Sequence, residues 1–514
     1  MKNNHRKEVT FISQSILAST LRGILVGIAV GIVVVAFRLA IEKIFHLVTD
    51  LYQMAHNQPI YLVSILLGYF VIAWIVGKMI KAEPHIKGSG IPQVEAELKG
   101  MMHLNWWSVL WRKFVGGTLA IASGLMLGRE GPSIQLGAVT GKGVAKWLKT
   151  SEMEKRSLIA SGAAAGLAAA FNAPIAGLLF VVEEIYHQFS RLVWISALAA
   201  SITANFISLH VFGLTPVLDM PDKLPVLGLN QYWVYVLLGI FLGAAGYFYE
   251  VVILNIQKFY QFLARFVPIK PQYYSFFAFL FIIPIGYFYP NLLGGGHHLI
   301  LDLPKTSPTL MLLIFYLVIR FVWSMISYGS GLPGGIFLPI LTLGSLLGMF
   351  AGRLAFDFGW ISQGEVTLFI ILGMTGFFAA ISKAPLTAMI LVTEMVGDMR
   401  QLMVIGLVAL TAYIVMDLLG GAPVYEAMLE KLLPEYMDED NTEMTLIEVV
   451  VSEHLANRYV SELHLPHNTL ITSQVHHGKN RVVKGNSRLH LGDSIYVAVP
   501  VSDIHQIRQL LEGH

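Results

Sequence analysis

The feature that most constrains this chain is a pair of opposite charges, Arg129 and Glu130, inside the otherwise apolar stretch Leu125–Leu136. A charged group at membrane depth costs roughly 2.5–3.5 kcal/mol on insertion scales, so its presence indicates a function. Pro132 is a favourable early helix residue, because its missing N–H is one that the helix could not use. We therefore predict a helix over Ser133–Trp147 that begins in mid-membrane. Its free backbone N–H groups would face Glu130, where a negative charge is stabilised.

The composition indicates an integral membrane protein. Of the 514 residues, 55% are hydrophobic and 13% are charged, whereas soluble proteins carry about 25% charged residues. The absence of cysteine excludes disulfides and cysteine-ligated metals, and a net charge of +2 gives no indication of nucleic acid binding. The first apolar stretch has no small-residue cleavage site, so we interpret Leu21–Phe37 as a retained first span.

Lysine and arginine cluster in three connections between apolar segments, whereas the connection His46–Pro59 has neither. By the positive-inside rule, the basic connections and the N-terminus are expected to be cytoplasmic. The basic residues concerned are Lys78, Lys81, Lys87 and Lys99, then Lys142, Lys146, Lys149, Lys155 and Arg156, then Arg265 and Lys270.

The chain also contains an internal repeat with helix breaks at matching places. Such a repeat is typical of secondary transporters, whose substrate site lies between the two repeated parts. The sequence does not fix whether the repeat is inverted, although that arrangement is common. The aligned parts are Gly162–Pro174 with Gly373–Pro385, Glu183 with Glu394, and Gly128–Pro132 with Gly335–Pro339.

Three glycine–proline breaks free backbone N–H groups in mid-membrane, where bulk water cannot satisfy them. An anion would satisfy them. Ser89 adds a hydroxyl donor, whereas Ile336 and Phe337 offer main-chain N–H groups and an apolar wall. Such a site of partial charges suits a weakly bound monovalent anion that must also leave. The breaks are Gly88–Pro92, Gly128–Pro132 and Gly334–Pro339.

These breaks, together with a later tyrosine, resemble the four anion-site motifs of the CLC chloride channel/transporter family, in the family's order. The resemblance covers most of residues 16–432. It implies an all-α polytopic membrane protein with broken re-entrant helices and two inverted halves, forming a homodimer with one pore per subunit. The motifs are Gly88–Pro92, Gly128–Pro132, Gly335–Pro339 and Tyr425 in Gly420–Tyr425.

The same resemblance implies a role for each site residue. Ser89 and Tyr425 would contact the central anion with their side chains, and Ile336 and Phe337 with their main-chain N–H groups. Glu130 would be the external gating glutamate, which blocks the path when ionised and swings out when protonated. Competition of proton and anion for one place would couple their movements. No cofactor is implied beyond the transported chloride.

The choice between an exchanger and a channel depends on a second acid. Glu184 matches the internal proton acceptor of proton-coupled members, which favours exchange of chloride for protons over a passive, gated chloride channel of the same fold. An idle, solvated carboxylate pair with Glu183 is the alternative. Glu95 matches an acid near that position, Lys113 a lysine in the field of the pore, and Arg129 lies beside the gate.

Ser89 also matches the chloride-handling members of the family, so we expect chloride to be favoured. An enzyme is a rival hypothesis from another class. An intramembrane protease would need a Ser/His pair, paired aspartates or a His-Glu-x-x-His motif on its spans, and the sequence has none of these. The resemblance places the protein in the bacterial cell membrane, with both termini cytoplasmic.

The character of the chain changes after the last apolar segment. We divide it into a transport domain (1–432), an acidic linker (433–445) and a soluble module (446–514). Alternating hydrophobicity predicts strands at 447–451, 469–475 and 494–499, and a short helix at 503–511.

Two segments of this module, Ser461–Pro466 and Leu489–Val497, resemble the C-terminal subdomain of RCK/TrkA-type regulators of ion transport. The resemblance implies a small α+β cytosolic domain that dimerises and binds a ligand, in some relatives a cyclic dinucleotide. A spacer without a ligand is the alternative. Eight of the 17 histidines lie in this module, but their spacing matches no metal site, so we expect a solvated surface.

Overall fold

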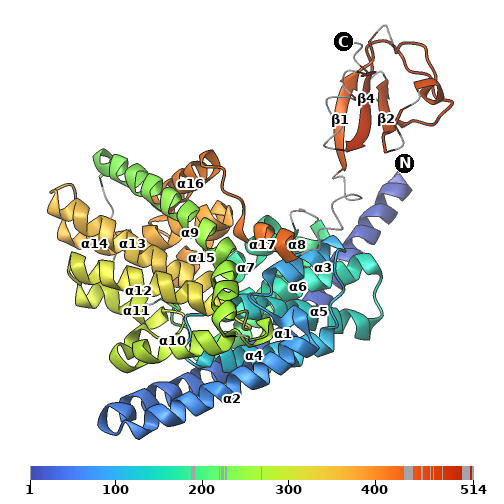
Figure 1. The fold of residues 1–514 in the computed structure, drawn as a ribbon. Coiled ribbons are helices and arrows are strands. Elements are labelled where there is room, and N and C mark those ends of the chain that lie inside the picture. The colour runs from blue at the N-terminus through green and yellow to red at the C-terminus, as the bar shows by residue number, and fades with distance from the viewer. Residues whose placement is uncertain are drawn as a thin grey trace. The chain divides into compact units, whose positions relative to one another are not determined.

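The computed structural model divides the chain into two compact units, Met1–Glu430 and Lys431–His514 (Figure 1). It describes residues 2–514 apart from 187–190, 219, 221–224, 226–227, 268, 433–443, 453–454, 464, 467, 477–478, 501–506, 508–509 and 512–514.

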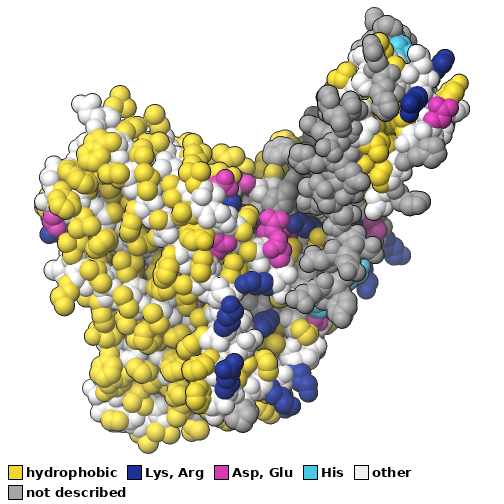
Figure 2. Space-filling view, turned by 45° about the horizontal axis from the view of Figure 1, so that its top comes forward, with side chains coloured by type: hydrophobic (Ala, Val, Ile, Leu, Met, Phe, Trp, Pro, Cys, Tyr) yellow, Lys and Arg dark blue, Asp and Glu magenta, His cyan; other side chains and the backbone are white. Residues whose placement is uncertain are grey.

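The first unit is helical and belongs in a membrane. Among its described residues, seven helices are long and apolar enough to cross a bilayer. Figure 2 shows hydrophobic side chains over most of the visible face of this unit, with most of the visible charged side chains gathered to one side. The protein is therefore a multi-pass membrane protein.

Most helices of the first unit follow one another with short connections, and the longest connection, residues 213–231, separates α8 from α9. The first group comprises α1 (Lys2–Asn57), α2 (Ile60–Ala82), η1 (Pro84–Ile86), α3 (Ile91–Lys99), α4 (Trp106–Ala122), α5 (Glu130–Leu148), α6 (Glu152–Phe171), α7 (Pro174–Phe180), η2 (Val181–Tyr186) and α8 (Arg191–Phe212). The second comprises α9 (Tyr232–Phe266), α10 (Ser275–Phe288), α11 (His297–Thr306), α12 (Leu310–Gly329), α13 (Phe337–Asp357), α14 (Val366–Ser382), α15 (Pro385–Val396), α16 (Leu402–Leu418) and α17 (Val424–Leu432).

The two groups repeat one packing pattern. Helix α5 packs on α6 as α13 packs on α14, and α8 packs on α1 and α6 as α16 packs on α9 and α14. Glycines allow these close contacts, because a Cβ added at Gly137 would overlap the carbonyl oxygen of Gly162, and one at Gly373 would overlap that of Gly344. The internal repeat predicted from the sequence is therefore confirmed as a repeat of structure.

The repeat is inverted, as hydrogen bonds between α7 and α15 show. Glu394, near the end of α15, accepts bonds from the first N–H groups of α7, and Glu183, just beyond α7, accepts bonds from the first N–H groups of α15. Since each helix ends beside the start of the other, the two run antiparallel. The bonds are Ile175 N and Ala176 N to Glu394 (3.1 and 2.8 Å) and Leu386 N and Thr387 N to Glu183 (3.2 and 2.7 Å).

Two predicted boundaries are wrong. Leu21–Phe37 is only the middle of α1, which continues as far as Asn57, so most of the predicted connection His46–Pro59 is helical. No proline interrupts this stretch before Pro59, and buried side chains such as Tyr52 continue its packing face. The helix after the charged pair begins at Glu130 instead of Ser133, because Arg129 already has helical backbone angles.

The second unit contains a four-stranded antiparallel sheet in the order β1-β4-β2-β3. The three predicted strands are confirmed, whereas β3 was missed because its Lys-Asn-Arg-Val sequence is short and mostly polar. Residues 433–443 of the predicted acidic linker and most of the predicted helix at 503–511 lie outside the described residues. The last two positions of that linker, Met444 and Thr445, already belong to β1, so the sheet begins earlier than the predicted boundary at 446. The strands are β1 (Met444–Val450), β2 (Leu470–His476), β3 (Lys479–Val482) and β4 (Ser494–Pro500).

Candidate functional site

The three glycine–proline breaks meet at one place in the first unit. The N–H of Gly334 donates to the carbonyl of Gly88 at 3.0 Å. Gly128 and Gly335 donate to each other's carbonyls, both at 2.7 Å, and form an isolated antiparallel bridge. The breaks that precede α3, α5 and α13 are thus joined directly. The starts of three helices converge there, where their dipoles favour negative charge.

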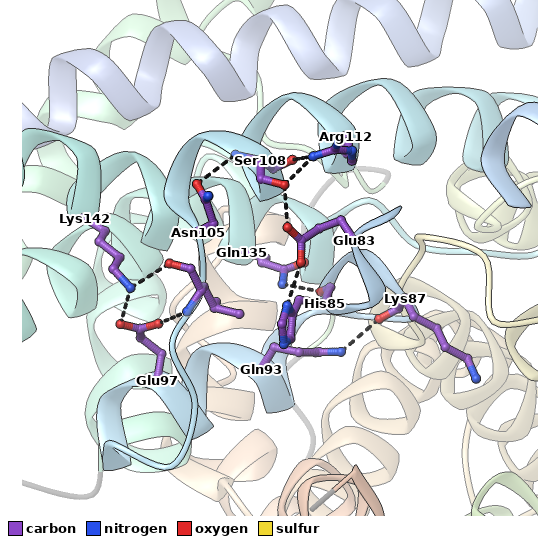
Figure 3. A network of polar contacts seen from close by, with 11 residues as sticks. Glu83, His85, Lys87, Gln93, Glu97, Asn105, Ser108, Arg112, Gln135 and Lys142 are labelled. Carbon is purple, nitrogen blue, oxygen red and sulfur yellow. Dashed lines mark hydrogen bonds and ion pairs between the residues drawn. The ribbon is translucent and has the colours of Figure 1, made fainter. Parts of the chain in front are cut away.

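The loop that carries Ser89 is fixed through its carbonyl groups. The four consecutive carbonyls of residues 85–88 each accept a bond from a side chain of α3, α4 or α5, and Figure 3 shows two of these contacts. Because these carbonyl oxygens already accept hydrogen bonds, they repel an anion near Ser89 less than free carbonyls would. The bonds are Gln135 to His85 O (2.8 Å), Lys113 to Ile86 O (2.9 Å) and Gly88 O (2.7 Å), and Gln93 to Lys87 O (3.0 Å).

A second polar network behind this loop ties α3 and η1 to α4 and α5 (Figure 3). Glu97 pairs with Lys142 at 2.5 Å and also accepts the N–H of Leu104 at 2.5 Å. Glu83 contacts both His85 and Ser108. These buried bonds hold the loop on two sides, so Ser89 is presented by a rigid frame.

Ser89 is 2% exposed and lies against the start of α5. A Cβ added at Gly131 would overlap the Ser89 hydroxyl, so glycine is required for this close approach. Gly90 has a φ of +93°, which turns the chain from the loop into α3. Among the described groups, no protein atom forms a hydrogen bond with the Ser89 hydroxyl.

Glu130 is the first residue of α5 and is fully buried. Its carboxylate faces the backbone N–H groups of Leu338 in α13 and of Glu130 itself, without reaching full hydrogen-bond geometry. Arg129 instead forms an ion pair with Glu42 at 2.9 Å. The gate candidate is therefore not locked to its charged neighbour, and it occupies the start of a helix where an anion would bind.

Tyr425 lies in the first turn of α17 and is 1% exposed. Its ring meets Phe180 edge-on with centroids 6.2 Å apart, and Phe180 meets Phe337 in the same way at 5.9 Å. With the buried Ile336, these rings form an apolar wall. Among the described groups, the Tyr425 hydroxyl has no hydrogen-bond partner.

The side chains of Ser89, Glu130 and Tyr425 share one property. Each carries a buried polar atom that no described protein group satisfies. Buried polar atoms in proteins are nearly always paired, so atoms of this kind indicate a ligand position. The hydroxyl donors and free helix starts fit a ligand that accepts hydrogen bonds.

Glu184 lies in η2, a π-helical turn that follows α7, and is 5% exposed. Such turns occur frequently at functional sites. The Glu184 side chain is close enough to Tyr425 and Glu95 to interact with both electrostatically. Glu95 in turn forms an ion pair with Lys99 at 2.9 Å. Glu184 is not part of a solvated pair, because it is buried and Glu183 is bonded to the start of α15. Its role in proton transfer stays a prediction.

A cavity of about 370 Å³ lies beside the gate candidate and was not predicted from the sequence. Its lining includes Arg38, Glu42, Arg129, His297 and Leu338. Arg129 is paired with Glu42, so two arginines and one carboxylate leave this lining with a net positive charge, which favours anions. Arg38 is itself buried and donates 2.7 and 2.8 Å bonds to the Ala169 carbonyl and the Ser208 hydroxyl.

Arg320 is a second buried cation that we missed. It is fully buried in α12 and donates to the carbonyls of Leu292 (3.0 Å), Gly294 (2.8 Å) and Gly295. It thereby fixes the turn that leads into α11, along the same cavity. An arginine within an apolar segment was a visible signal, since such residues are rare without a function.

The fold and the site together define a polytopic membrane protein in which broken helices from two inverted halves converge on a buried acidic residue. Residues 68–417 match the family model described as voltage gated chloride channel, and residues 444–512 match the TrkA-C domain. The chain belongs to the voltage gated chloride channel (CLC) family.

Similar proteins agree with this assignment. The chain is 35% identical over 398 residues to a protein of Vibrio vulnificus named H(+)/Cl(-) exchange transporter ClcA, covering 74% of this chain and 82% of the relative. A relative of the same name from Yersinia pestis is 35% identical over 375 residues, covering 72% and 76% of the two chains. The crystal structure of a slow cyanobacterial Cl-/H+ antiporter superposes with a TM-score of 0.75 at 30% identity, over 82% of this chain and 99% of that one.

Proposed function

We propose that this protein is a secondary active transporter that exchanges chloride for protons, and not an enzyme. The observation that carries the proposal is the Glu130 carboxylate, buried where the starts of three broken helices meet. The names of the relatives support exchange, since they are described as H(+)/Cl(-) exchange transporters. Chloride and protons are then its substrates.

In this proposal, ionised Glu130 occupies an anion position beside the Leu338 N–H and closes the path. When a proton neutralises it, the carboxyl group loses its attraction to the helix starts and leaves. Chloride then takes the position, held by the hydroxyls of Ser89 and Tyr425 and by the N–H groups of Ile336 and Phe337. Because proton and chloride compete for one place, the movement of each depends on the other.

Glu184 is the proposed internal proton acceptor. It is buried, and it lies close enough to Tyr425, in the apolar wall, for the two side chains to interact electrostatically. Glu95 and Lys99 lie on the same side, and Lys99 also reaches Glu426 at 3.4 Å. These groups support a proton route that enters separately from the chloride path and joins it near Glu130.

The test is the reversal potential of purified protein in liposomes under combined chloride and pH gradients. The wild type should reverse away from the chloride equilibrium potential, because each turnover also moves protons. Glu130→Gln should pass chloride without proton movement. Glu152→Gln is the matched control, since its side chain is 82% exposed, and should behave as the wild type.

Two results would contradict parts of the proposal. Reversal of the wild type at the chloride potential would make it a passive channel of the same fold. Persistent proton coupling in Glu130→Gln would remove Glu130 from the gate while leaving exchange itself intact.

We further propose that the protein acts as a homodimer in the cell membrane with both termini cytoplasmic. Residues 1–432 would form the transport domain, 433–445 a linker, and 446–514 a regulatory domain that takes a small ligand, a cyclic dinucleotide being one candidate. The match to the TrkA-C domain supports the regulatory part. Chloride in the pore needs no additional cofactor.

A further inference from the structure

The C-terminal unit brings together three side chains that are separated in sequence. His476 ends β2, whereas His490 and Asp493 belong to the turn that leads into β4. In the described part of the chain, these are the three potential metal ligands whose donor atoms all lie within 4.8 Å of one another. The spacing of the histidines in the sequence did not indicate this, because the sheet creates the proximity.

The two ligand–ligand distances that involve Asp493 lie on either side of the value expected for a tetrahedral ion, and the shorter one is a hydrogen bond that the ion would replace. Asp493 Oδ2 lies 2.7 Å from His476 Nδ1 and 3.7 Å from His490 Nδ1. Zinc–ligand bonds of about 2.0–2.1 Å in tetrahedral geometry place the ligand atoms about 3.3 Å apart, between these two values. Small side-chain rotations would therefore be enough to surround an ion.

The surrounding structure holds the carboxylate in place. Gln474 Nε2 donates to Asp493 Oδ2 at 2.6 Å and lies 3.3 Å from His490 Nδ1. The backbone of the turn is fixed by bonds from Val451 N to Asp493 O (2.8 Å) and from Gly492 N to Val451 O (3.0 Å). A donor that orients a ligating carboxylate in this way is typical of metal sites.

We propose that this cluster binds a divalent transition-metal ion of the Zn²⁺ type. Two imidazoles and one carboxylate suit such an ion, whereas Mg²⁺ and Ca²⁺ prefer oxygen ligands throughout. The His490 side chain is 48% exposed, so an ion can enter from solvent, and a fourth position remains for water or another ligand. The ion would join the end of β2 to the turn before β4.

The test is titration of the full-length protein, purified without a polyhistidine tag, with zinc chloride in a calorimeter. The wild type should bind about one Zn²⁺ per chain. His490→Gln should weaken binding at least tenfold, and Gln474→Ala roughly tenfold, because a group that orients a ligand contributes 10–100-fold in affinity. His103→Ala, which removes an exposed histidine of the first unit, should bind as the wild type.

Cobalt chloride provides a second measurement, since tetrahedral Co²⁺ absorbs strongly in the visible range. The wild type should show this absorption and lose it when Zn²⁺ is added. The proposal is overturned if the wild type shows no saturable binding, if His490→Gln binds Zn²⁺ as tightly as the wild type, or if Mg²⁺ competes equally. His490 is half-exposed, so its substitution should leave the fold intact, and an unchanged circular dichroism spectrum checks this.

Discussion

Gly128 and Gly335 donate backbone hydrogen bonds to each other's carbonyls, both at 2.7 Å, and so join the two halves of the membrane unit at its centre. The two glycines hold equivalent positions in the repeat, one before α5 and one before α13. The bridge therefore sets the distance between the two helix starts. Any change in this distance would alter both sides of the candidate anion site together.

Gly131→Ala should weaken chloride binding about tenfold or more. The added Cβ would overlap the Ser89 hydroxyl and lie 2.9 Å from the Ser89 carbonyl. Overpacking of this kind costs about 1–3 kcal/mol, and 1.4 kcal/mol corresponds to a factor of ten in affinity. Isothermal titration with chloride measures the effect.

Gly68→Ala is the control for this substitution, because a Cβ at Gly68 meets nothing within 4 Å. It should leave chloride affinity unchanged. Equal affinities for Gly131→Ala and the wild type would show that Ser89 does not bind the anion.

Lys113→Met should lower both the thermal stability and the rate of chloride transport. The substitution leaves the buried carbonyl of Ile86 without its donor, at a cost of about 1–3 kcal/mol, and leaves the Gly88 carbonyl with only its bond from the Gly334 N–H. Thermal unfolding and chloride efflux from liposomes measure the two effects. Lys146→Met, at an exposed position of α5, is the matched control. A stable, fully active Lys113→Met variant would contradict a positioning role for Lys113.

Tyr425→Phe should raise the chloride dissociation constant roughly two- to thirteenfold, the loss expected for one hydrogen bond of about 0.5–1.5 kcal/mol. The hydroxyl has no described protein partner, so its removal should not destabilise the protein. Tyr235→Phe removes a similarly buried, unpaired hydroxyl from α9 and should leave chloride affinity unchanged. Equal effects of the two substitutions in a chloride titration would argue against a ligand role for Tyr425.

Glu183 and Glu184 are adjacent, but their substitutions should differ in effect. Glu183→Ala removes the acceptor for the first N–H groups of α15, so it should lower the unfolding temperature, since caps of this kind contribute about 0.5–2 kcal/mol. Glu184→Ala should leave the unfolding temperature nearly unchanged and abolish proton movement while chloride flux continues. Melting curves and proton uptake by liposomes separate the two outcomes. A lower unfolding temperature for Glu184→Ala together with lost proton movement for Glu183→Ala would contradict both assignments.

The convergence of the three breaks could be anticipated from the sequence because glycine and proline act locally. A Gly-x-Gly-x-Pro or Gly-x-x-Gly-Pro segment interrupts a helix wherever it occurs, so the breaks at Gly88 and Gly128 were visible without coordinates. The equivalence of Glu183 and Glu394 was also visible in the repeat. Their reciprocal bonds were not, since only the antiparallel packing of α7 and α15 creates them.

Features that depend on distant packing escaped prediction. The full length of α1 was missed because the most apolar stretch is only part of the helix, which continues to Asn57, two residues before Pro59. Arg38 and Arg320 donate to acceptors far away in sequence, such as the carbonyls of Ala169 and Leu292, which no local pattern encodes. The cluster of His476, His490 and Asp493 likewise exists only once β2 and β4 are paired.

The exchange of carboxylates between α7 and α15 has a consequence for synthesis of the chain. The N–H group of Ala176 receives its acceptor from a residue 218 positions later. When the ribosome has made the first half, α7 therefore still lacks the partner that completes its start, and the apolar surroundings offer little water as a substitute. The start of α7 is therefore completed only once the second half has been inserted beside it.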